Sequence, residues 1–337
     1  MLPPEILLHI FSFLESEPFE LISCCTAHYV FAQIIEPALY CNVVVHNMPP
    51  AKSAGATFKT EEDGFRLSAP ELSNILSNSP HVVRYLHGLT IELSHFHLDS
   101  EATKRISSIL HKLRPLRITL SGTDSFLLDW SYFPVHFARA FVGSVSKSHL
   151  REVSIASVLS VPLSMFRNCT GLKTLKLHNG STSSIELQQA SPIPAYPLLE
   201  HLEITRWTYG QPSVLISWLK PRIINLRSLM LKTSNERIWH ILPKLLSICS
   251  KTLVELDIDF HSGMFLDHLS LIHAYLKTIQ ESQAKTLIFL VLRVLSDSSY
   301  TRTRGPLDRK ASMTATLSEL HFSPSYQLWR QFLHLTF

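Results

Sequence analysis

One short pattern recurs along most of this 337-residue chain and limits its fold more than any other feature. The pattern is Leu-x-x-[Leu/Val]-x-[Leu/Ile/Phe], in which apolar and variable residues alternate over the last three positions. Its nine copies are LHGLTI (86–91), LRPLRI (113–118), LREVSI (150–155), LKTLKL (172–177), LEHLEI (199–204), LRSLML (226–231), LVELDI (253–258), LIFLVL (287–292) and LSELHF (317–322). Four of the eight intervals between their first leucines are 27 residues long. A period of this length predicts a stacked repeat protein with one strand per repeat.

Segments with helical spacing lie between several of the copies, and they are 69–79, 102–113, 212–220 and 238–250. The predicted unit is a helix, a tight connection and a short strand whose apolar positions point into a shared core. The predicted fold class is an α/β solenoid in which all-α helices precede an irregular leucine-rich-repeat stack with a curved parallel sheet. We expect irregularity because the asparagine that follows the motif in well-formed leucine-rich repeats is mostly absent. The strands are predicted near 86–93, 113–120, 150–156, 172–178, 199–205, 226–232, 253–260, 287–294 and 317–322.

Composition divides the chain into three parts. Residues 46–68 lack periodicity and are rich in Pro, Ala, Lys and Glu, which predicts a linker or loop. This places a small domain at 1–45, ending in a short strand of sequence NVVV, and the solenoid at 69–337. Residues 296–315 are predicted to form a long polar insertion before the last repeat.

The N-terminal segment LPPEILLHIFSFLE (2–15) is too apolar for a helix that lies on one core. Only His9 and Ser12 are polar between Ile6 and Leu14, whereas a surface helix needs three or four apolar residues per two turns. A secretory signal is excluded because no Lys or Arg precedes the apolar stretch, and the stretch is too short to span a bilayer. The interpretation that needs no partner is a helix buried inside one large domain.

The same segment, followed by Pro18, an Ile/Cys-rich helix and IIEPALY (34–40), closely resembles an F-box domain. An F-box followed by leucine-rich repeats is common among fungal F-box proteins, and SNSPHVVRYLHGLTI (77–91) is similar to their sequences. The resemblance implies docking on a Skp-type adaptor of a cullin–RING ubiquitin ligase. The adaptor-binding residues that it implies are Leu2, Pro3, Glu5, Ile6, Leu7, Ile10, Phe11 and Leu14. TAHYVF (26–31) departs from the usual last helix of the family, which leaves the closing contacts of the domain open.

The variable positions of the repeats predict a second surface. Alternation along each strand directs them away from the core, and stacking places them in parallel rows about 5 Å apart. The candidate target-binding residues are Lys176, His178, His201, Glu203, Met230, Lys232, Glu255, Asp257 and Asp259. Solenoids bind partners on such faces, although a solvated face without a partner is the alternative.

Motifs for catalysis or cofactor binding are missing from the sequence. We find no Gly-x-Ser-x-Gly elbow, P-loop or dinucleotide fingerprint, so we predict no enzyme activity and no cofactor. Cys24, Cys25 and His28 invite a zinc site, but their spacing is not that of a zinc-ligand pair. The five cysteines fit reduced, mostly buried thiols, and we expect an intracellular protein, cytoplasmic and/or nuclear. With 31 basic and 27 acidic residues spread along the chain, composition supports neither a nucleic-acid nor a membrane partner.

These observations predict the substrate-recognition subunit of a Skp–cullin–F-box ubiquitin ligase. The N-terminal helices would bind the adaptor, and the repeats would recruit a protein target that the sequence does not specify. The alternative is a leucine-rich interaction or scaffold protein that takes no part in ubiquitination.

Overall fold

Parallel strands form one continuous ten-stranded sheet within the described part of the chain. The computed structural model describes residues 3–12, 18–48, 64–122, 127–182, 198–206, 212–232, 242–249, 251–261 and 289–295. The strand order is β12-β11-β10-β9-β8-β6-β4-β3-β1-β2. These strands are β1 (Asn42–His46), β2 (Phe65–Ser68), β3 (Gly88–Leu93), β4 (Arg117–Gly122), β6 (Glu152–Ala156), β8 (Thr174–His178), β9 (His201–Thr205), β10 (Ser228–Lys232), β11 (Glu255–His261) and β12 (Phe289–Leu295).

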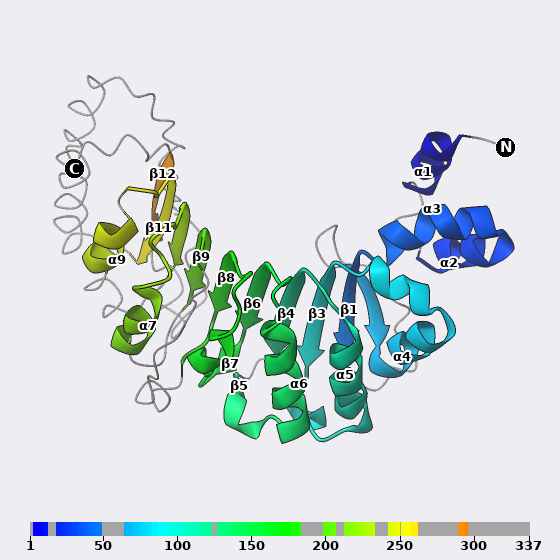
Figure 1. Ribbon diagram of the computed structural model, residues 1–337, viewed down its shortest axis with the longest axis horizontal. Coiled ribbons are helices and arrows are strands. Elements are labelled where there is room, and N and C mark those ends of the chain that lie inside the picture. The colour runs from blue at the N-terminus through cyan, green and yellow to red at the C-terminus, as the bar shows by residue number, and fades with distance from the viewer. Residues whose placement is uncertain are drawn as a thin grey trace, which may run out of the picture.

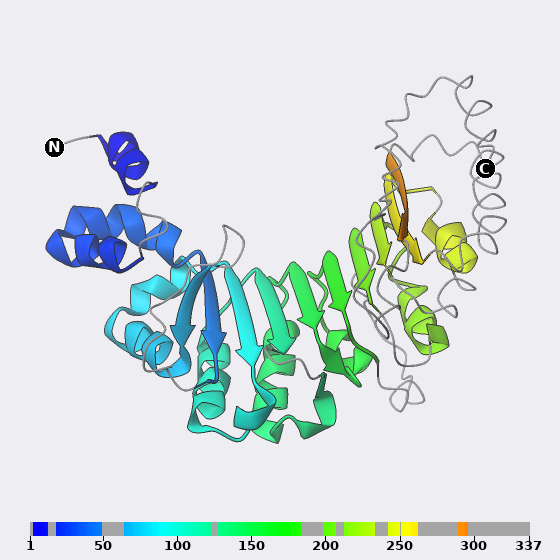
Figure 2. The ribbon, with the colours of Figure 1, turned by 180° about the vertical axis from the view of Figure 1, so that it is seen from behind.

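Helices cover one side of this sheet. Figure 1 shows the strands side by side along an arc, with the helices of the repeats on its outer side. They are α4 (Ala69–Asn78), α5 (Glu101–Lys112), α6 (Val135–Val145), α7 (Pro212–Leu219) and α9 (Leu242–Cys249), with the 3₁₀ turns η1 (Pro80–Arg84), η2 (His95–His97), η3 (Trp130–Tyr132) and η4 (Leu163–Phe166). Helices α1 (Pro4–Ser12), α2 (Pro18–Ala27) and α3 (Tyr29–Leu39) lie beyond β1 at one end (Figure 2). The prediction of N-terminal helices followed by a large parallel sheet is confirmed.

The repeated pattern forms the core because equivalent residues pair along the whole sheet. Leu175 is in register with Leu202, Leu229 and Leu256 on the next three strands. Each of these leucines is at most 2 % exposed. Burial of a leucine side chain contributes about 1.5–3 kcal/mol, so the aligned rows stabilise each repeat through its neighbours.

One copy of the pattern is aligned differently from the prediction. The copy at 113–118 suggests that Leu116 and Ile118 point inward, but Leu116 is 39 % exposed. The register instead pairs Ile118 with Leu89 and Leu120 with Ile91. The strand therefore begins two residues later than the motif implies. Pro115 lacks an N–H group and stands where the motif places its second variable residue, which explains the shift.

Two further elements differ from the prediction. Residues 65–68 form β2, at the edge of the sheet beside β1, although they lie within the predicted linker 46–68. A small second sheet pairs β5 (Leu128–Asp129) with β7 (Val158–Leu159). Both were missed because segments of two to four residues carry too few alternations to be distinguished from loops. The predicted insertion at 296–315 and the strand at 317–322 lie outside the described residues.

A buried asparagine joins the start of the sheet to the helical layer. Asn47 follows β1 and is 1 % exposed. Its Oδ1 accepts from the backbone N–H of Ser94 at 2.8 Å. Its Nδ2 lies 3.3 Å from the Ser94 carbonyl, 3.0 Å from the His97 carbonyl and 3.3 Å from Thr103 Oγ1. One side chain therefore fixes β1 against the turn after β3 and the first turn of α5.

Candidate functional site

Helix α1 has two different apolar faces. Leu7 and Phe11 are buried, at 7 % and 9 % exposure, and Phe11 packs edge to face on Phe31 of α3 with ring centroids 5.6 Å apart. Ile6 and Ile10 are 47 % and 43 % exposed. Each pair is spaced i, i+4, which places its two members on one side of the helix. The helix therefore contributes one face to its domain and leaves the other exposed.

The beginning of α1 follows from its two prolines. Pro4 is the first helical residue, where a missing N–H costs nothing. The Pro3 carbonyl accepts from the N–H groups of Ile6 and Leu7 at 3.1 and 3.2 Å. Pro3 itself is exposed beside the exposed isoleucines.

The structure places five of the eight predicted adaptor-binding residues. Pro3, Ile6 and Ile10 are exposed, whereas Leu7 and Phe11 belong to the core of the domain. The prediction did not separate these two groups, because the apolar character of α1 alone does not show which side faces α3. Leu2, Leu14 and the side chain of Glu5 lie outside the described residues. Sequence reasoning also missed Tyr29, which is 69 % exposed at the start of α3.

The cysteines of α2, Cys24 and Cys25, pack against the hydrophobic core. His28 is the N-cap of α3, where its Nδ1 accepts from the Val30 N–H at 3.2 Å. Cys24 and Cys25 are half-buried, and burial raises the pKa of Cys25 to about 11, with a smaller contribution from the Glu36 carboxylate. Within the described residues, no group of three potential ligands could hold a metal ion.

The comparison with protein families bears on this same segment. A family model described as F-box-like matches residues 1–46. Residues 1–46 are an F-box-like domain. The match ends at the last residue of β1, so the F-box-like domain includes α1–α3 and the strand by which it joins the sheet. Comparisons of the chain with curated proteins and with solved structures find no match.

The face of the sheet opposite the core is the second candidate surface. The register places the predicted residues in three rows across strands β8 to β11. The rows are His201, Ser228 and Glu255; Lys176, Glu203, Met230 and Asp257; and His178, Thr205, Lys232 and Asp259. Eight of the nine predicted target-binding residues are thus described with their side chains, and Asp259 is described by its backbone alone.

Most charges on this face are matched across neighbouring strands. Lys176 Nζ lies 2.8 Å from Glu152 Oε1, and Lys232 Nζ lies 3.9 Å from Asp257 Oδ2. His178 Nδ1 is 2.6 Å from Thr205 Oγ1 and 3.9 Å from Glu203 Oε1. Arg66 and Glu92, which were not predicted, form a pair at 2.8 Å that reaches across β1, from β2 to β3.

This pairing determines what the face can do. Burial lowers the pKa of His178, although Glu203 opposes the shift, so the imidazole favours its neutral form. Both lysines of this part of the face are paired with carboxylates, and Glu203, Glu255 and Asp259 remain in addition, so carboxylates outnumber lysines from β6 to β11. A partner would have to displace existing ion pairs, and the carboxylates of β11 favour hydrogen-bond donors or positive charge in that partner.

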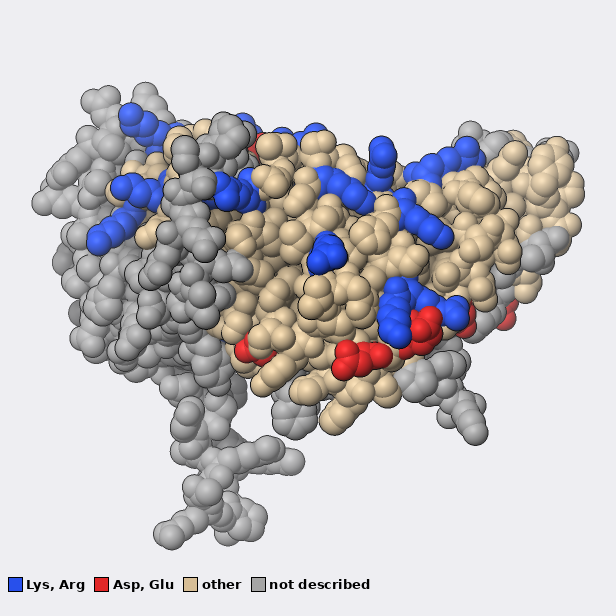
Figure 3. Space-filling model, turned by 60° about the horizontal axis from the view of Figure 1, so that its bottom comes forward, with Lys and Arg blue, Asp and Glu red and all other residues tan. Residues whose placement is uncertain are grey.

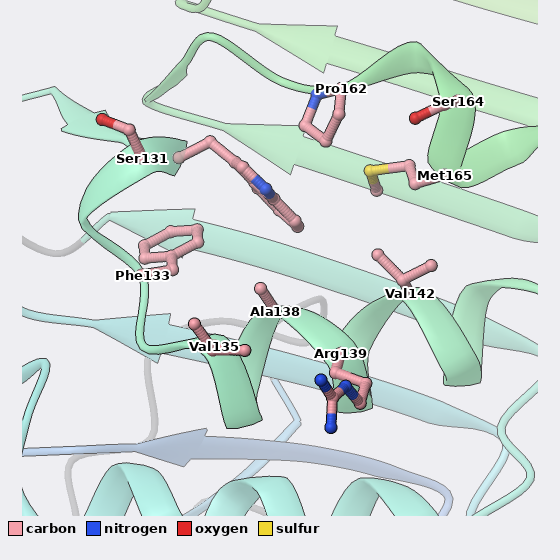
Figure 4. Close-up of a pocket in the computed structure, with 10 residues that line it drawn as sticks. Ser131, Phe133, Val135, Ala138, Arg139, Val142, Pro162, Ser164 and Met165 are labelled. Carbon is pink, nitrogen blue, oxygen red and sulfur yellow. The ribbon is translucent and has the colours of Figure 1, made fainter. Parts of the chain in front are cut away.

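A hollow of about 500 Å³ lies on the helical side, between η3, α6 and η4. Figure 4 shows apolar side chains pointing toward it, among them Phe133, Val142 and Met165. Its polar lining consists of Ser131, Ser164 and Arg139, which contains no acid–base pair for catalysis. Among the described residues, no helix is long and apolar enough to cross a membrane.

Proposed function

We propose that this chain is the substrate-recognition subunit of a Skp–cullin–F-box ubiquitin ligase. In this proposal the F-box-like domain binds a Skp-type adaptor, and the solenoid recruits a protein target. The observation that supports it best is the division of α1 within the F-box-like domain. Leu7 and Phe11 complete the core, while Ile6 and Ile10 remain exposed.

The exposed face of α1 has the properties of a docking site. Two isoleucines at 47 % and 43 % exposure lie one turn apart on a helix of nine residues. Their burial by a partner would contribute roughly 1.5–3 kcal/mol together, since full burial of one isoleucine contributes about that much and each of the two is nearly half exposed. A domain of about forty residues buries little surface alone, so docking would also stabilise it.

The sheet supports the second half of the proposal. We assign 1–45 to the F-box, 46–68 to the connection, apart from β2, and 69–337 to an irregular leucine-rich-repeat solenoid of the fungal type. An exposed face of parallel strands is the surface on which solenoids bind partners. The chain would act without catalytic residues of its own, by holding a target lysine near the ubiquitin-loaded enzyme and so raising its effective concentration. This role requires an intracellular protein, cytoplasmic and/or nuclear.

Reconstitution tests the proposal. The full chain is combined with a Skp-type adaptor, a cullin–RING core, ubiquitin and the activating and conjugating enzymes. We expect it to join the complex and to support ubiquitin transfer to a captured protein or to itself. The Ile6→Asp/Ile10→Asp variant should do neither, because two carboxylates would be buried without partners.

The matched control is Leu116→Asp/Ile224→Asp. These residues are 39 % and 53 % exposed and lie on the solenoid, so their replacement should leave assembly intact. Failure of the wild-type chain to bind the adaptor would refute the proposal. Binding without ubiquitin transfer would instead support a non-catalytic scaffold.

A further inference from the structure

Basic residues gather at one edge of the sheet, although composition gave no sign of it. All strands are parallel, so every connection that enters a strand reaches the same edge. The described parts of these connections carry Arg84, Arg114, Lys147, Arg151, Arg167, Lys173, Lys220, Arg227 and Lys251, which together with Lys112 at the end of α5 we call the basic edge; Arg222 also lies there but is buried against Trp218. Figure 3 shows lysines and arginines in a band across the molecule, with the acidic residues mainly near the lower rim.

Acidic residues are outnumbered at this edge, where Glu152 and Glu255 begin β6 and β11 and Glu36 of α3 lies 2.8 Å from His81. In the connections that enter β3, β4, β6, β8, β9, β10 and β11, the described segments contain one carboxylate, Glu200. Glu200 is 2.7 Å from Lys173 Nζ, and that lysine, together with Arg227, lowers its pKa. One carboxylate is therefore shared between two cations, while Arg114, Lys147 and Arg151 have no ion pair with any described carboxylate.

The cations at the centre of the edge repel one another. Lys147 Nζ donates to the carbonyls of Leu110 and Leu113, which holds it at the C-terminal end of α5 beside Arg114. Burial lowers the pKa of His149, and the charges of Lys147, Arg114 and Arg151 lower it further. His149 Nε2 is buried and has no hydrogen-bond partner within the described structure. An anion at this position would relieve the repulsion of the fixed cations.

We infer that the basic edge binds an extended, carboxylate-rich segment of the target protein. The distance from the β4 connection to the β10 connection is four strand spacings, roughly 19 Å. An extended peptide of about six residues covers that distance at about 3.3 Å per residue. Such a segment could contact Arg114, Arg151 and Arg227 in turn without displacing the ion pairs of the sheet face. This inference rests on the proposed function, because that function makes the partner a protein.

The same edge is poorly suited to nucleic acid. Single-stranded nucleic acids bind by stacking bases on exposed aromatic rings as well as by phosphate contacts. The aromatic residue in the described connections of this edge is Tyr85. Its ring is covered by the Arg84 guanidinium, 4.7 Å from the ring centroid. A peptide needs no such stacking surface.

Fluorescence anisotropy with the full chain tests the inference. The probe is a fluorescein-labelled peptide of ten glutamates, compared with a peptide of ten glutamines and a ten-nucleotide oligouridine. Of the three probes, we expect only the glutamate peptide to bind well, and we expect its affinity to fall as the salt concentration is raised. Arg114→Glu/Arg151→Glu should weaken it by about tenfold or more, since two attractive contacts become repulsive.

The control variant is Lys104→Glu/Arg139→Glu, which changes the net charge equally at exposed positions of α5 and α6. Arg151 donates to the Gly171 carbonyl at 3.1 Å, so its replacement removes a hydrogen bond, and circular dichroism must show that Arg114→Glu/Arg151→Glu is folded. If that variant is not folded, Arg114→Glu/Arg227→Glu replaces it in the test. The inference is overturned if the glutamate peptide does not bind, if both variants weaken it equally, or if oligouridine binds more tightly. Adaptor binding measured on the same variants keeps the two proposals separate, because the basic edge should not affect it and Ile6→Asp/Ile10→Asp should not affect the peptide.

Discussion

Replacement of Asn47 by alanine should weaken the joint between the F-box-like domain and the sheet. The variant removes the acceptor of the Ser94 N–H and the donors to the Ser94 and His97 carbonyls, all in a site where Asn47 is 1 % exposed. Removing a buried N–H acceptor costs about 1–3 kcal/mol, and each further lost hydrogen bond about 0.5–1.5 kcal/mol. The expected loss in the free energy of unfolding is therefore roughly 3 kcal/mol.

Urea unfolding followed by circular dichroism measures this loss, and amide hydrogen exchange locates it. Exchange should accelerate in β1 and in residues 94–103, which Asn47 connects, and much less in β9 to β11. Asn225→Ala is the control, because Asn225 is exposed and its replacement should change stability by less than about 0.5 kcal/mol. A loss below about 1 kcal/mol for Asn47→Ala, or exchange that rises equally along the whole sheet, would refute this explanation of the joint.

Three further predictions concern the solenoid. Leu229→Ala should lower the free energy of unfolding in urea by about 3 kcal/mol, and Met230→Ala by less than about 1 kcal/mol. The reason is that Leu229 is 0 % exposed in the core, whereas Met230 lies half-buried on the opposite face. Similar losses for the two variants would contradict the assigned faces. Burial raises the pKa of Cys169 and of Cys249 to about 12, so both thiols should resist a thiol reagent until the chain unfolds. Peptide mapping of the labelled protein measures this, and rapid labelling of either cysteine in the native state would contradict its buried position. Burial lowers the pKa of His149 below its usual 6.5, so as pH falls the imidazole is protonated in the unfolded chain before it is protonated in the folded one. The wild type should therefore lose stability between about pH 7 and about pH 5, and His149→Gln should lose less. Parallel profiles of unfolding free energy against pH for the two proteins would contradict this.

The strands of the repeated pattern were predictable because the alternation of apolar and polar residues within each strand shows which side chains are buried. In LKTLKL and LEHLEI the alternation alone identifies Leu175, Leu177, Leu202 and Ile204, and all four are buried. The helix at 102–113 was equally visible, and α5 extends over Glu101–Lys112. Where the local signal misleads, as at Leu116, the register of the neighbouring strands decides.

What could not be predicted depends on contacts between distant residues. The parallel order β4-β6-β8 brings Lys176 beside Glu152, and it also brings together the basic residues Arg114, Lys147 and Arg151. Neither contact can be predicted before that order is known. Intervals of unequal length hide these juxtapositions in the sequence. The two faces of α1 were hidden for a similar reason, since Phe31 on α3 determines which side of α1 is buried.

The affinity of the full chain for a Skp-type adaptor, measured by isothermal titration calorimetry, tests the central claim most directly. The wild-type chain and the Leu116→Asp/Ile224→Asp control should bind with the same affinity. The Ile6→Asp/Ile10→Asp variant should bind at least about 100-fold more weakly, since burying one unpaired carboxylate already costs more than about 3 kcal/mol. Equal binding by a folded Ile6→Asp/Ile10→Asp variant, or no binding by the wild type, would contradict the claim that the exposed face of α1 is the docking surface.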